Sequence, residues 1–429
     1  MAKSALPVSL YRHTFRYRRR RLYCEDVPVE RIAEEVGTPV YVYSKKTILE
    51  HYRKLRRALA PLNPLICFSV KSNSNLAVLR VLAREGSGFD VVSGGELFRV
   101  LKVGADPRKI VFASVGKTGE EIRSAIQEGI LSLNVESLPE LDRIEEIAGH
   151  LKRTVRVALR LNPEVETRTH HYVQTAKSES KFGITFEEAR KIFHHLEAFP
   201  HVLLRGVHIH IGSQILESRP FVEGVRKTVG FINALRKDGI PVEWINIGGG
   251  LGIVYANERA QTTQEYARAV LPLLRGRKLR VILEPGRFIM GNSGILLSRV
   301  IYVKRQGGKN FLIVDAGMND LIRPSLYGAY HEIEPVHQVN GPRWPNCDIV
   351  GPVCESGDFL AKNRPFPRVR EGSLLAVYGA GAYGFVMASN YNSRPRPAEV
   401  LVSGSRFAVV RDRESQKDLI RGEKIPRWV

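Results

Sequence analysis

The sequence predicts an α/β protein in which a TIM-like (β/α)8 barrel is joined to a C-terminal domain made mostly of β-strands. Eight short apolar runs, rich in β-branched residues, alternate with helical patterns between residues 65 and 283, as such a barrel requires. Past Glu284 the apolar runs follow one another with turns and few helices, which is typical of a β domain. Conspicuous polar residues come at the ends of the barrel runs, where the active sites of such barrels lie.

The elements are expected in three successive regions. Residues 1–44 should hold a basic arm, a helix at 29–36 and a strand at 38–42 that joins the β domain. Residues 45–285 should form the barrel, with strands at 65–70, 89–92, 110–112, 131–135, 155–161, 203–211, 242–247 and 279–283. Helical patterns lie at 47–59, 74–84, 95–103, 119–129, 138–150, 186–198 and 220–238. Residues 286–429 should form the β domain, with strands at 295–304, 309–315, 349–353, 374–378, 399–403 and 407–411.

Composition narrows the class of protein. The 429 residues are 43% hydrophobic, enough for two domains with cores of their own. No apolar run approaches the ~18 residues of a membrane span. Residues 1–10 lack a signal-peptide core, so we expect no export. The four cysteines have no CxxC spacing, which argues against metal sites and disulfides and favours the cytoplasm.

A basic, partly aromatic segment at residues 11–21 accounts for part of the net charge of +21. Interleaved arginines and aromatic residues could bind phosphates or nucleic acid. Charge runs are more often solvated surface, so we favour a solvated arm over a nucleic-acid site.

Lys71 comes at the end of the first barrel run, Ile66-Cys67-Phe68-Ser69-Val70. Partial burial would lower the pKa of its ammonium and free the amine to attack an aldehyde, most often that of pyridoxal phosphate. The alternative is a lysine whose ammonium reaches solvent. Only the later segments favour the cofactor.

Further polar residues fall on the same face of the predicted barrel. Asp90 lies near the second strand, His210 closes the sixth, and Glu284 follows the eighth. A buried carboxylate can keep the pyridine nitrogen of pyridoxal phosphate protonated, and we give Glu284 that role. His210 could stack on the ring. For His208, on the same strand face, we prefer a core histidine.

Glycines follow the seventh strand at Gly248, Gly249 and Gly250. Their N–H groups could approach a phosphate, although a tight turn also needs glycine. Gly286 and Arg287 follow Glu284 beside this loop, and Ser213 could also lie near the phosphate. A structural ion pair is the alternative for Glu284 and Arg287.

Residues of the β domain add candidate chemistry. The thiol of Cys354 could return a proton to a carbanion, although a lone cysteine is more often a small core residue. The neighbouring Glu355 could hold an ammonium. Arg323 carries a planar guanidinium suited to a carboxylate, and Tyr383 lies in a glycine-rich turn.

These motifs together resemble the diaminopimelate decarboxylases, pyridoxal phosphate enzymes built like alanine racemase and ornithine decarboxylase. The resemblance runs from about Gly37 to Ser403, and its most specific pieces are residues 162–183, 315–332, 351–362 and 384–400. No expected catalytic position departs from the family pattern.

The resemblance implies decarboxylation of meso-2,6-diaminopimelate at its D-centre to L-lysine and CO2, the last step of lysine biosynthesis. It implies pyridoxal 5'-phosphate bound as a Schiff base to Lys71, and a homodimer with active sites at the interface. The catalytic candidates are Lys71, His210 and Cys354. The implied cofactor contacts are Lys71, Asp90, His210, Ser213, Gly248, Gly249, Gly250, Glu284, Gly286, Arg287 and Tyr383. The implied substrate contacts are Arg287, Arg323, Tyr327, Glu355 and Tyr383.

The charges of the candidate residues also favour one substrate over others. The far end of meso-diaminopimelate carries an ammonium and a carboxylate, which Glu355 and Arg323 would match. A diamine-forming decarboxylase would need no arginine there. Another amino-acid decarboxylase or racemase of this fold, and a non-catalytic pyridoxal phosphate carrier, remain as alternatives.

Overall fold

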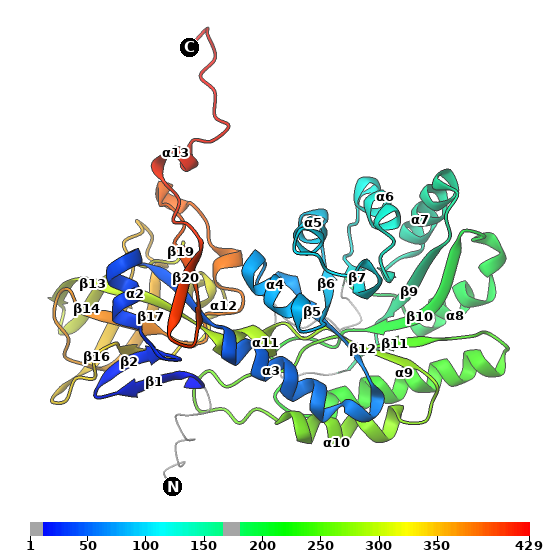
Figure 1. Ribbon diagram of the computed structural model, residues 1–429, viewed down its shortest axis with the longest axis horizontal. Coiled ribbons are helices and arrows are strands. Elements are labelled where there is room, and N and C mark those ends of the chain that lie inside the picture. The colour runs from blue at the N-terminus through cyan, green and yellow to red at the C-terminus, as the bar shows by residue number, and fades with distance from the viewer. Residues whose placement is uncertain (1–11, 166–180) are drawn as a thin grey trace. The chain divides into compact units, whose positions relative to one another are not determined.

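The computed structural model describes residues 12–165 and 181–429, which form two compact units (Figure 1). The barrel unit comprises Leu49–Ile253 and Arg259–Ile289. The β unit comprises the chain up to Ile48 together with Val254–Glu258 and Met290–Val429. The expected divisions at residues 44/45 and 285/286 therefore differ by a few positions, and residues 254–258 belong with the β unit. Part of the specific segment 162–183 and the start of the basic segment lie outside the described residues.

Eight parallel strands close the barrel, as predicted. They are β5 (Leu65–Ser69), β6 (Gly88–Val91), β7 (Ile110–Ala113), β8 (Ser132–Val135), β9 (Val155–Leu161), β10 (Val202–Ile209), β11 (Trp244–Asn246) and β12 (Arg280–Leu283). Neighbours in sequence are neighbours in the sheet, and β12 pairs with β5 to close the ring. All eight strands therefore direct their C-terminal ends to one face of the barrel.

Helices alternate with the barrel strands, and the periodicity predicts all of them except the one at 263–274. They are α3 (Lys45–Ala58), α4 (Leu76–Arg84), α5 (Gly94–Lys102), α6 (Gly119–Glu128), α7 (Leu138–Leu151), α8 (Phe186–His194), α9 (Arg219–Lys237) and α10 (Thr263–Leu274). Three of them, α6, α8 and α10, begin with a capping box in which a threonine and the glutamate three residues later satisfy each other's backbone N–H. These local signals define where the helices begin.

The barrel interior is close-packed. One cluster of buried side chains comes from five different strands and includes Cys67, Val111 and Trp244. Gly206 on β10 lies directly against Trp244, and a Cβ there would come within 2.1 Å of the indole. Glycine is therefore required at this position for the tryptophan to fill the core.

The β unit is built around a mixed sheet in the order β17-β16-β14-β13-β4-β19-β20. Its strands are β4 (Val40–Ser44), β13 (Gly294–Gln306), β14 (Lys309–Val314), β16 (Arg343–Val350), β17 (Phe359–Pro367), β19 (Ala398–Ser403) and β20 (Arg406–Arg411), while β18 (Leu374–Val377) pairs with β13 and with β15 (Ile333–Pro335). β4 lies between β13 and β19, which confirms that the N-terminal strand joins this sheet.

The strand expected at residues 349–353 ends earlier than predicted. β16 stops at Val350, and the N–H of Val353 donates to the Asp358 carboxylate at 2.6 Å instead of to a neighbouring strand. The same carboxylate accepts a 2.6 Å hydrogen bond from Met318 N–H. Residues 351–358 therefore form a turn that is held by one buried aspartate.

The basic segment is not a solvated arm in its described part. Phe15–Arg18 (β1) and Arg21–Cys24 (β2) form an antiparallel hairpin, and β2 also pairs with Val27–Pro28 (β3). Phe15 and Leu22 are fully buried in the core of the β unit, whereas Arg16 and Arg18 are exposed. Side chains alternate between the two faces of a strand, so a segment rich in arginine can also bury apolar residues. The prediction of a solvated arm considered only the charge of the segment.

No helix within residues 12–165 and 181–429 is long and apolar enough to span a membrane.

Candidate active site

Lys71 lies in a short turn, Val70–Ser72, directly after β5. Its Nζ is 3.4 Å from Oδ2 of Asp90 on β6, and its side chain is 38% exposed. Ser69 Oγ donates to the same Asp90 oxygen at 2.5 Å. The lysine therefore stands at the C-terminal face of the barrel, with its ammonium against a buried carboxylate.

Asp90 is fully buried, and its pKa is raised above the usual value. Burial is the main cause and the negative charge of Glu284 adds to it, while Lys71 and the Ser69 hydrogen bond oppose them. Its second oxygen, Oδ1, is buried and accepts no hydrogen bond from the described part of the chain. Such an atom is rare in a native core and points to a missing partner.

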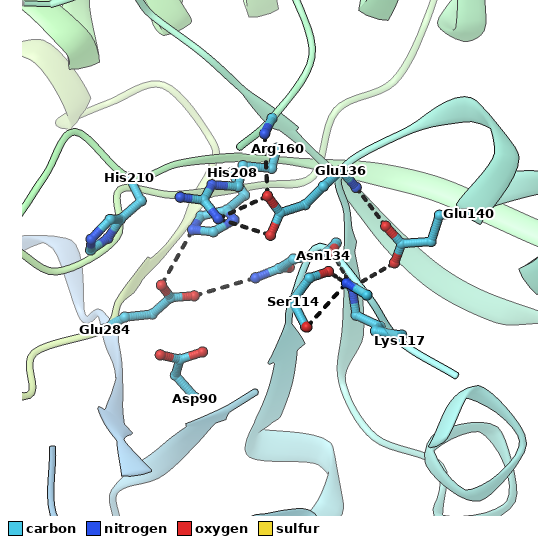
Figure 2. A network of polar contacts seen from close by, with 12 residues as sticks. Asp90, Ser114, Lys117, Asn134, Glu136, Glu140, Arg160, His208, His210 and Glu284 are labelled. Atoms are coloured by element: carbon cyan, nitrogen blue, oxygen red, sulfur yellow. Dashed lines mark hydrogen bonds and ion pairs between the residues drawn. The ribbon is translucent and has the colours of Figure 1, made fainter. Parts of the chain in front are cut away.

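Glu284, directly after β12, contacts His208 and Asn134 inside the barrel (Figure 2). Its carboxylate accepts hydrogen bonds from Nδ2 of Asn246 at 2.6 Å and Nδ2 of Asn134 at 3.3 Å, and His208 Nε2 lies 3.2 Å away. Burial by itself raises the pKa of Glu284. The attraction and hydrogen bond of His208, assisted by Lys71, outweigh burial and hold this pKa below its usual value. Glu284 is therefore a buried carboxylate that stays ionised.

His208 was expected to be an ordinary core histidine. It is indeed buried, at 1% exposed, but its partner is the Glu284 carboxylate. His208 therefore belongs to the site and not only to the core. Asn134 and Asn246, on β8 and β11, were also missed. They are polar residues inside predicted barrel strands, and that departure from the apolar pattern is the signal that could have found them.

His210 follows β10 immediately, and its Nδ1 accepts a hydrogen bond from the N–H of Gly249 at 3.3 Å. Burial and then the charge of Lys71 lower its pKa well below the usual value. The imidazole is therefore neutral at physiological pH. A neutral ring next to Lys71 suits stacking on an aromatic cofactor better than it suits acid catalysis.

The loop after β11 packs so closely against neighbouring backbone that it requires glycine. A Cβ on Gly248 would come within 2.4 Å of the Ile209 carbonyl, and one on Gly249 within 2.2 Å of the Glu284 carbonyl. The N–H of Gly248 donates to Asn246 Oδ1 at 3.0 Å. Close packing alone accounts for these two glycines, so a phosphate contact at Gly248, Gly249 and Gly250 stays a prediction.

Arg287 is the first residue of a short helix, Arg287–Met290 (α11), and is 8% exposed. Its Nη2 donates to Ser213 Oγ at 3.0 Å. Gly286 packs so tightly that a Cβ would lie 3.0 Å from Ser72 and 3.1 Å from Ser69. Two predicted phosphate contacts, Arg287 and Ser213, are thus brought together next to the turn that carries Lys71.

A second set of buried charges lies at the ends of β7, β8 and β9 (Figure 2). Arg160 Nη1 donates to both carboxylate oxygens of Glu136, at 2.8 and 2.9 Å. Lys117, whose side chain is fully buried, donates to Glu140 at 2.5 Å and to the backbone carbonyls of Ser114 and Asn134. These three acceptors saturate the Lys117 ammonium, so it supports the framework and is no nucleophile.

The remaining predicted residues belong to the β unit. Arg323 and Tyr327 begin and end the short helix α12 (Arg323–Tyr327), and Tyr383 adopts a positive φ of 56° in the glycine-rich turn. Cys354 and Glu355 are exposed in the turn before β17. Cys354 is therefore not a small core residue.

The turn that carries Cys354 is held by several hydrogen bonds. Asn392 Oδ1 accepts from the N–H of Cys354 at 2.7 Å, and the Tyr391 hydroxyl donates to Glu355 Oε2 at 3.4 Å. Ser325 of α12 donates to the Gly357 carbonyl at 2.5 Å. The structure thus links α12 to the Cys354–Glu355 turn.

The barrel residues fit pyridoxal phosphate. A lysine at a strand end suits the aldehyde, an ionised buried carboxylate suits the protonated pyridine nitrogen, and a buried arginine next to a serine suits the phosphate. The unpartnered Oδ1 of Asp90 adds a buried acceptor at the same face. Within the described residues, no group of three histidines, cysteines, aspartates or glutamates could hold a metal ion.

Comparison with known proteins agrees with this set. Residues 45–291 match the family model described as pyridoxal-dependent decarboxylase, pyridoxal binding domain. A diaminopimelate decarboxylase of Pseudomonas aeruginosa is 48% identical over 413 residues, which cover 96% of this chain and 99% of that protein. Another diaminopimelate decarboxylase, of Aquifex aeolicus, is 46% identical over 406 residues, which cover 94% of this chain and 96% of that protein.

Solved structures agree along nearly the whole chain. The diaminopimelate decarboxylase of Helicobacter pylori, complexed with L-lysine, has a TM-score of 0.88 at 41% identity and covers 92% of this chain and 98% of that chain. The diaminopimelate decarboxylase of M. jannaschii in co-complex with L-lysine has a TM-score of 0.93 at 36% identity and covers 97% of this chain and 99% of that chain.

Proposed function

We propose that this chain, which belongs to the diaminopimelate decarboxylase family, decarboxylates meso-2,6-diaminopimelate at its D-centre to give L-lysine and CO2 with pyridoxal 5'-phosphate. This reaction is the last step of lysine biosynthesis. The observation that carries the proposal is a buried, ionised Glu284 at the same barrel face as Lys71. A racemase or another decarboxylase would share that pair, so the substrate rests on the family and on Arg323.

The barrel residues divide the binding of the cofactor among them. Lys71 would hold the aldehyde carbon, and Glu284 would hold the pyridine nitrogen. Arg287 and Ser213 would hold the phosphate, with Gly248, Gly249, Gly250, Gly286 and Tyr383 close to it. When bound, the cofactor accepts the electron pair that the breaking bond to the carboxyl group leaves behind.

Two barrel residues tune this arrangement. His210 is neutral, so it would cover a ring face without adding charge. Asp90 has a raised pKa, and its Oδ2 lies within 3.4 Å of Lys71 Nζ. A carboxyl group that accepts a proton easily, placed at the amine, can take up or release the proton that the amine exchanges.

The proton donor to Cα is proposed to be Cys354. Its thiol is exposed in the single chain, and its backbone N–H is fixed by Asn392. A donor in an exposed turn can serve the active site of a second copy. We therefore propose a homodimer in which Cys354 and Glu355 of one protomer complete the site of its partner.

The distal end of the substrate needs a cation and an anion. Arg323 would bind the distal carboxylate with its guanidinium fork, and Glu355 would bind the distal ammonium. Tyr327 and Tyr383 would complete the substrate contacts, with Arg287. All four cysteines are free, in agreement with a reducing compartment such as the cytoplasm.

The test is the release of CO2 and L-lysine from meso-diaminopimelate by purified holoenzyme. Wild type should release both in equal amounts, and Cys354→Ala should lose most of its turnover while it retains the cofactor absorbance. Cys347→Ala, which removes a buried thiol from the same unit, is the matched control for thiol loss. Absence of CO2 release by cofactor-loaded wild type, with turnover of ornithine, arginine or alanine instead, would contradict the substrate assignment.

A further inference from the structure

Arg323 is held in a defined orientation by two neighbours within the β unit. The residue is 6% exposed, and its Nη1 lies 2.9 Å from Nε2 of His331. Its guanidinium carbon lies 4.9 Å from the centre of the Tyr255 ring. The two rings also meet each other edge to face, with centres 5.5 Å apart and planes at 75°. Arg323, His331 and Tyr255 thus form one packed group.

The protonation of His331 follows from its partners. Nδ1 lies 2.8 Å from the carbonyl oxygen of Tyr378, and a carbonyl can only accept, so Nδ1 carries the hydrogen. A guanidinium can only donate, so Nε2 accepts from Arg323. His331 is fully buried, and it is the neutral Nδ1–H tautomer. A protonated ring could not make the second bond.

The backbone places these partners together. β15 pairs with β18, with Ile333 opposite Val377, so His331 and Tyr378 stand just beyond the paired ends. The backbone N–H of Tyr378 donates to the carbonyl of Glu332 at 2.8 Å and continues that pairing.

Tyr255 comes from the short segment 254–258 that belongs to the β unit although barrel sequence surrounds it. The Glu258 carboxylate accepts from the N–H groups of Tyr255, at 2.7 Å, and Ala256, at 2.9 Å. This segment is therefore folded into a tight loop that presents the ring to Arg323.

We infer that His331 is a positioning residue, assisted by Tyr255, that aims the Arg323 guanidinium and thereby selects substrates with a carboxylate at the distal end. Neither a neutral imidazole nor a tyrosine ring carries a negative charge, so these contacts orient the guanidinium without neutralising it. A guanidinium that is already oriented binds a carboxylate more tightly, because its side chain loses less conformational entropy on binding. The inference rests on the proposed function, since it deepens the role given there to Arg323.

Two substitutions at one position separate this role from a structural one. In His331→Gln, the carboxamide oxygen reaches the place of Nε2 and can still accept from Arg323, but the hydrogen bond to the Tyr378 carbonyl is lost. In His331→Asn, the carboxamide nitrogen reaches the place of Nδ1 and keeps the backbone bond, but position 331 no longer accepts from Arg323.

The ligands also form a matched pair. L-lysine carries the distal carboxylate, whereas 1,5-diaminopentane is the same molecule without it. Calorimetry with the holoenzyme should show that His331→Asn binds L-lysine about tenfold more weakly than wild type does, which corresponds to the loss of roughly one charge-assisted hydrogen bond. The affinity for 1,5-diaminopentane should not change. His331→Gln should bind both ligands nearly as wild type does. For meso-diaminopimelate, the KM of His331→Asn should rise more than its kcat falls.

Three results would overturn the inference. If both variants bind L-lysine equally weakly, the role of His331 is structural and depends on its hydrogen bond to the backbone. Unchanged L-lysine binding in His331→Asn would mean that Arg323 does not depend on it. Unchanged L-lysine binding in Arg323→Met would place the carboxylate elsewhere. Each of these would leave the proposed reaction standing as long as wild type releases CO2 from meso-diaminopimelate, and the third would remove only Arg323 from its substrate contacts.

Discussion

Glu284 shows how single residues set the chemistry of the barrel. Burial alone would favour its neutral form, which could not hold a protonated pyridine nitrogen. The attraction and hydrogen bond of His208, assisted by Lys71, reverse that preference, and Asn134 and Asn246 donate further hydrogen bonds to the same carboxylate. Asp90, equally buried but with fewer donors, shifts in the opposite direction. The pKa values of two carboxyl groups in one interior therefore shift in opposite directions because their immediate partners differ.

Replacement of His208 should move the pH dependence of catalysis. In wild type the pKa of Glu284 is held low, so Glu284 contributes no acid limb near neutral pH. In His208→Leu burial remains but the ion pair is lost, so the pKa rises and Glu284 becomes protonated as the pH falls from neutral. Profiles of kcat/KM against pH should therefore show an acid limb shifted to higher pH.

The control for this prediction is His208→Gln, whose amide can still donate to Glu284 and should shift the limb less. His150→Gln, on the exposed end of α7, should leave the profile unchanged. An acid limb at the same pH in His208→Leu as in wild type would contradict the role of His208.

At the scale of elements, the hairpin β1–β2 shows that a charge-rich segment can belong to a core. Its strands alternate between buried side chains, such as Phe15 and Leu22, and exposed arginines. The exposed arginines bind the surface of their own unit, as Arg18 does with Asp26 at 2.7 Å. The hairpin therefore stabilises the β unit by its apolar face, and its basic face is solvated.

Phe15→Ala should lower the free energy of unfolding of the β unit by about 3–5 kcal/mol, because it removes a large, fully buried side chain. Arg16→Ala, one residue along on the exposed face, should change it by less than about 0.5 kcal/mol. Urea unfolding monitored by circular dichroism measures both. Similar small effects for the two variants would show that the hairpin does not contribute to the core.

At the scale of the whole molecule, the proposed residues are divided between two units. The barrel unit carries Lys71, Asp90, His210, Glu284 and Arg287, whereas the β unit carries Arg323, Cys354 and Tyr383. If sites form between protomers, each needs Lys71 from one chain and Cys354 from the other. Such a division predicts complementation between two inactive variants.

Lys71→Ala should lose cofactor absorbance and turnover, and Cys354→Ala should lose most turnover. After the two are mixed and exchanged, about a quarter of all sites should regain both residues, because random pairing makes half the dimers mixed and each mixed dimer has one intact site. The measurement is CO2 release before and after exchange.

Mixing Lys71→Ala with the double variant Lys71→Ala/Cys354→Ala is the control and should restore nothing. If mass spectrometry detects mixed dimers without regained turnover, the proposed shared site is wrong.

The sequence by itself determined the barrel, the N-terminal strand in the β sheet and the position of Lys71 and Glu284 at strand ends. These features depend on local periodicity and on the rule that parallel strands end at one face. The family also followed from the sequence, since its motifs are short and contiguous. The roles of the individual site residues remain predictions.

Only the tertiary structure decided which residues meet. Asn134, His208 and Asn246 converge on Glu284 because closure of the barrel brings β8, β10 and β11 around one interior, and their spacing along the chain carries no sign of it. Burial of Phe15 and the assignment of residues 254–258 to the β unit likewise depend on contacts between distant segments. Local pattern specifies elements, whereas long-range packing specifies partners, burial and therefore protonation.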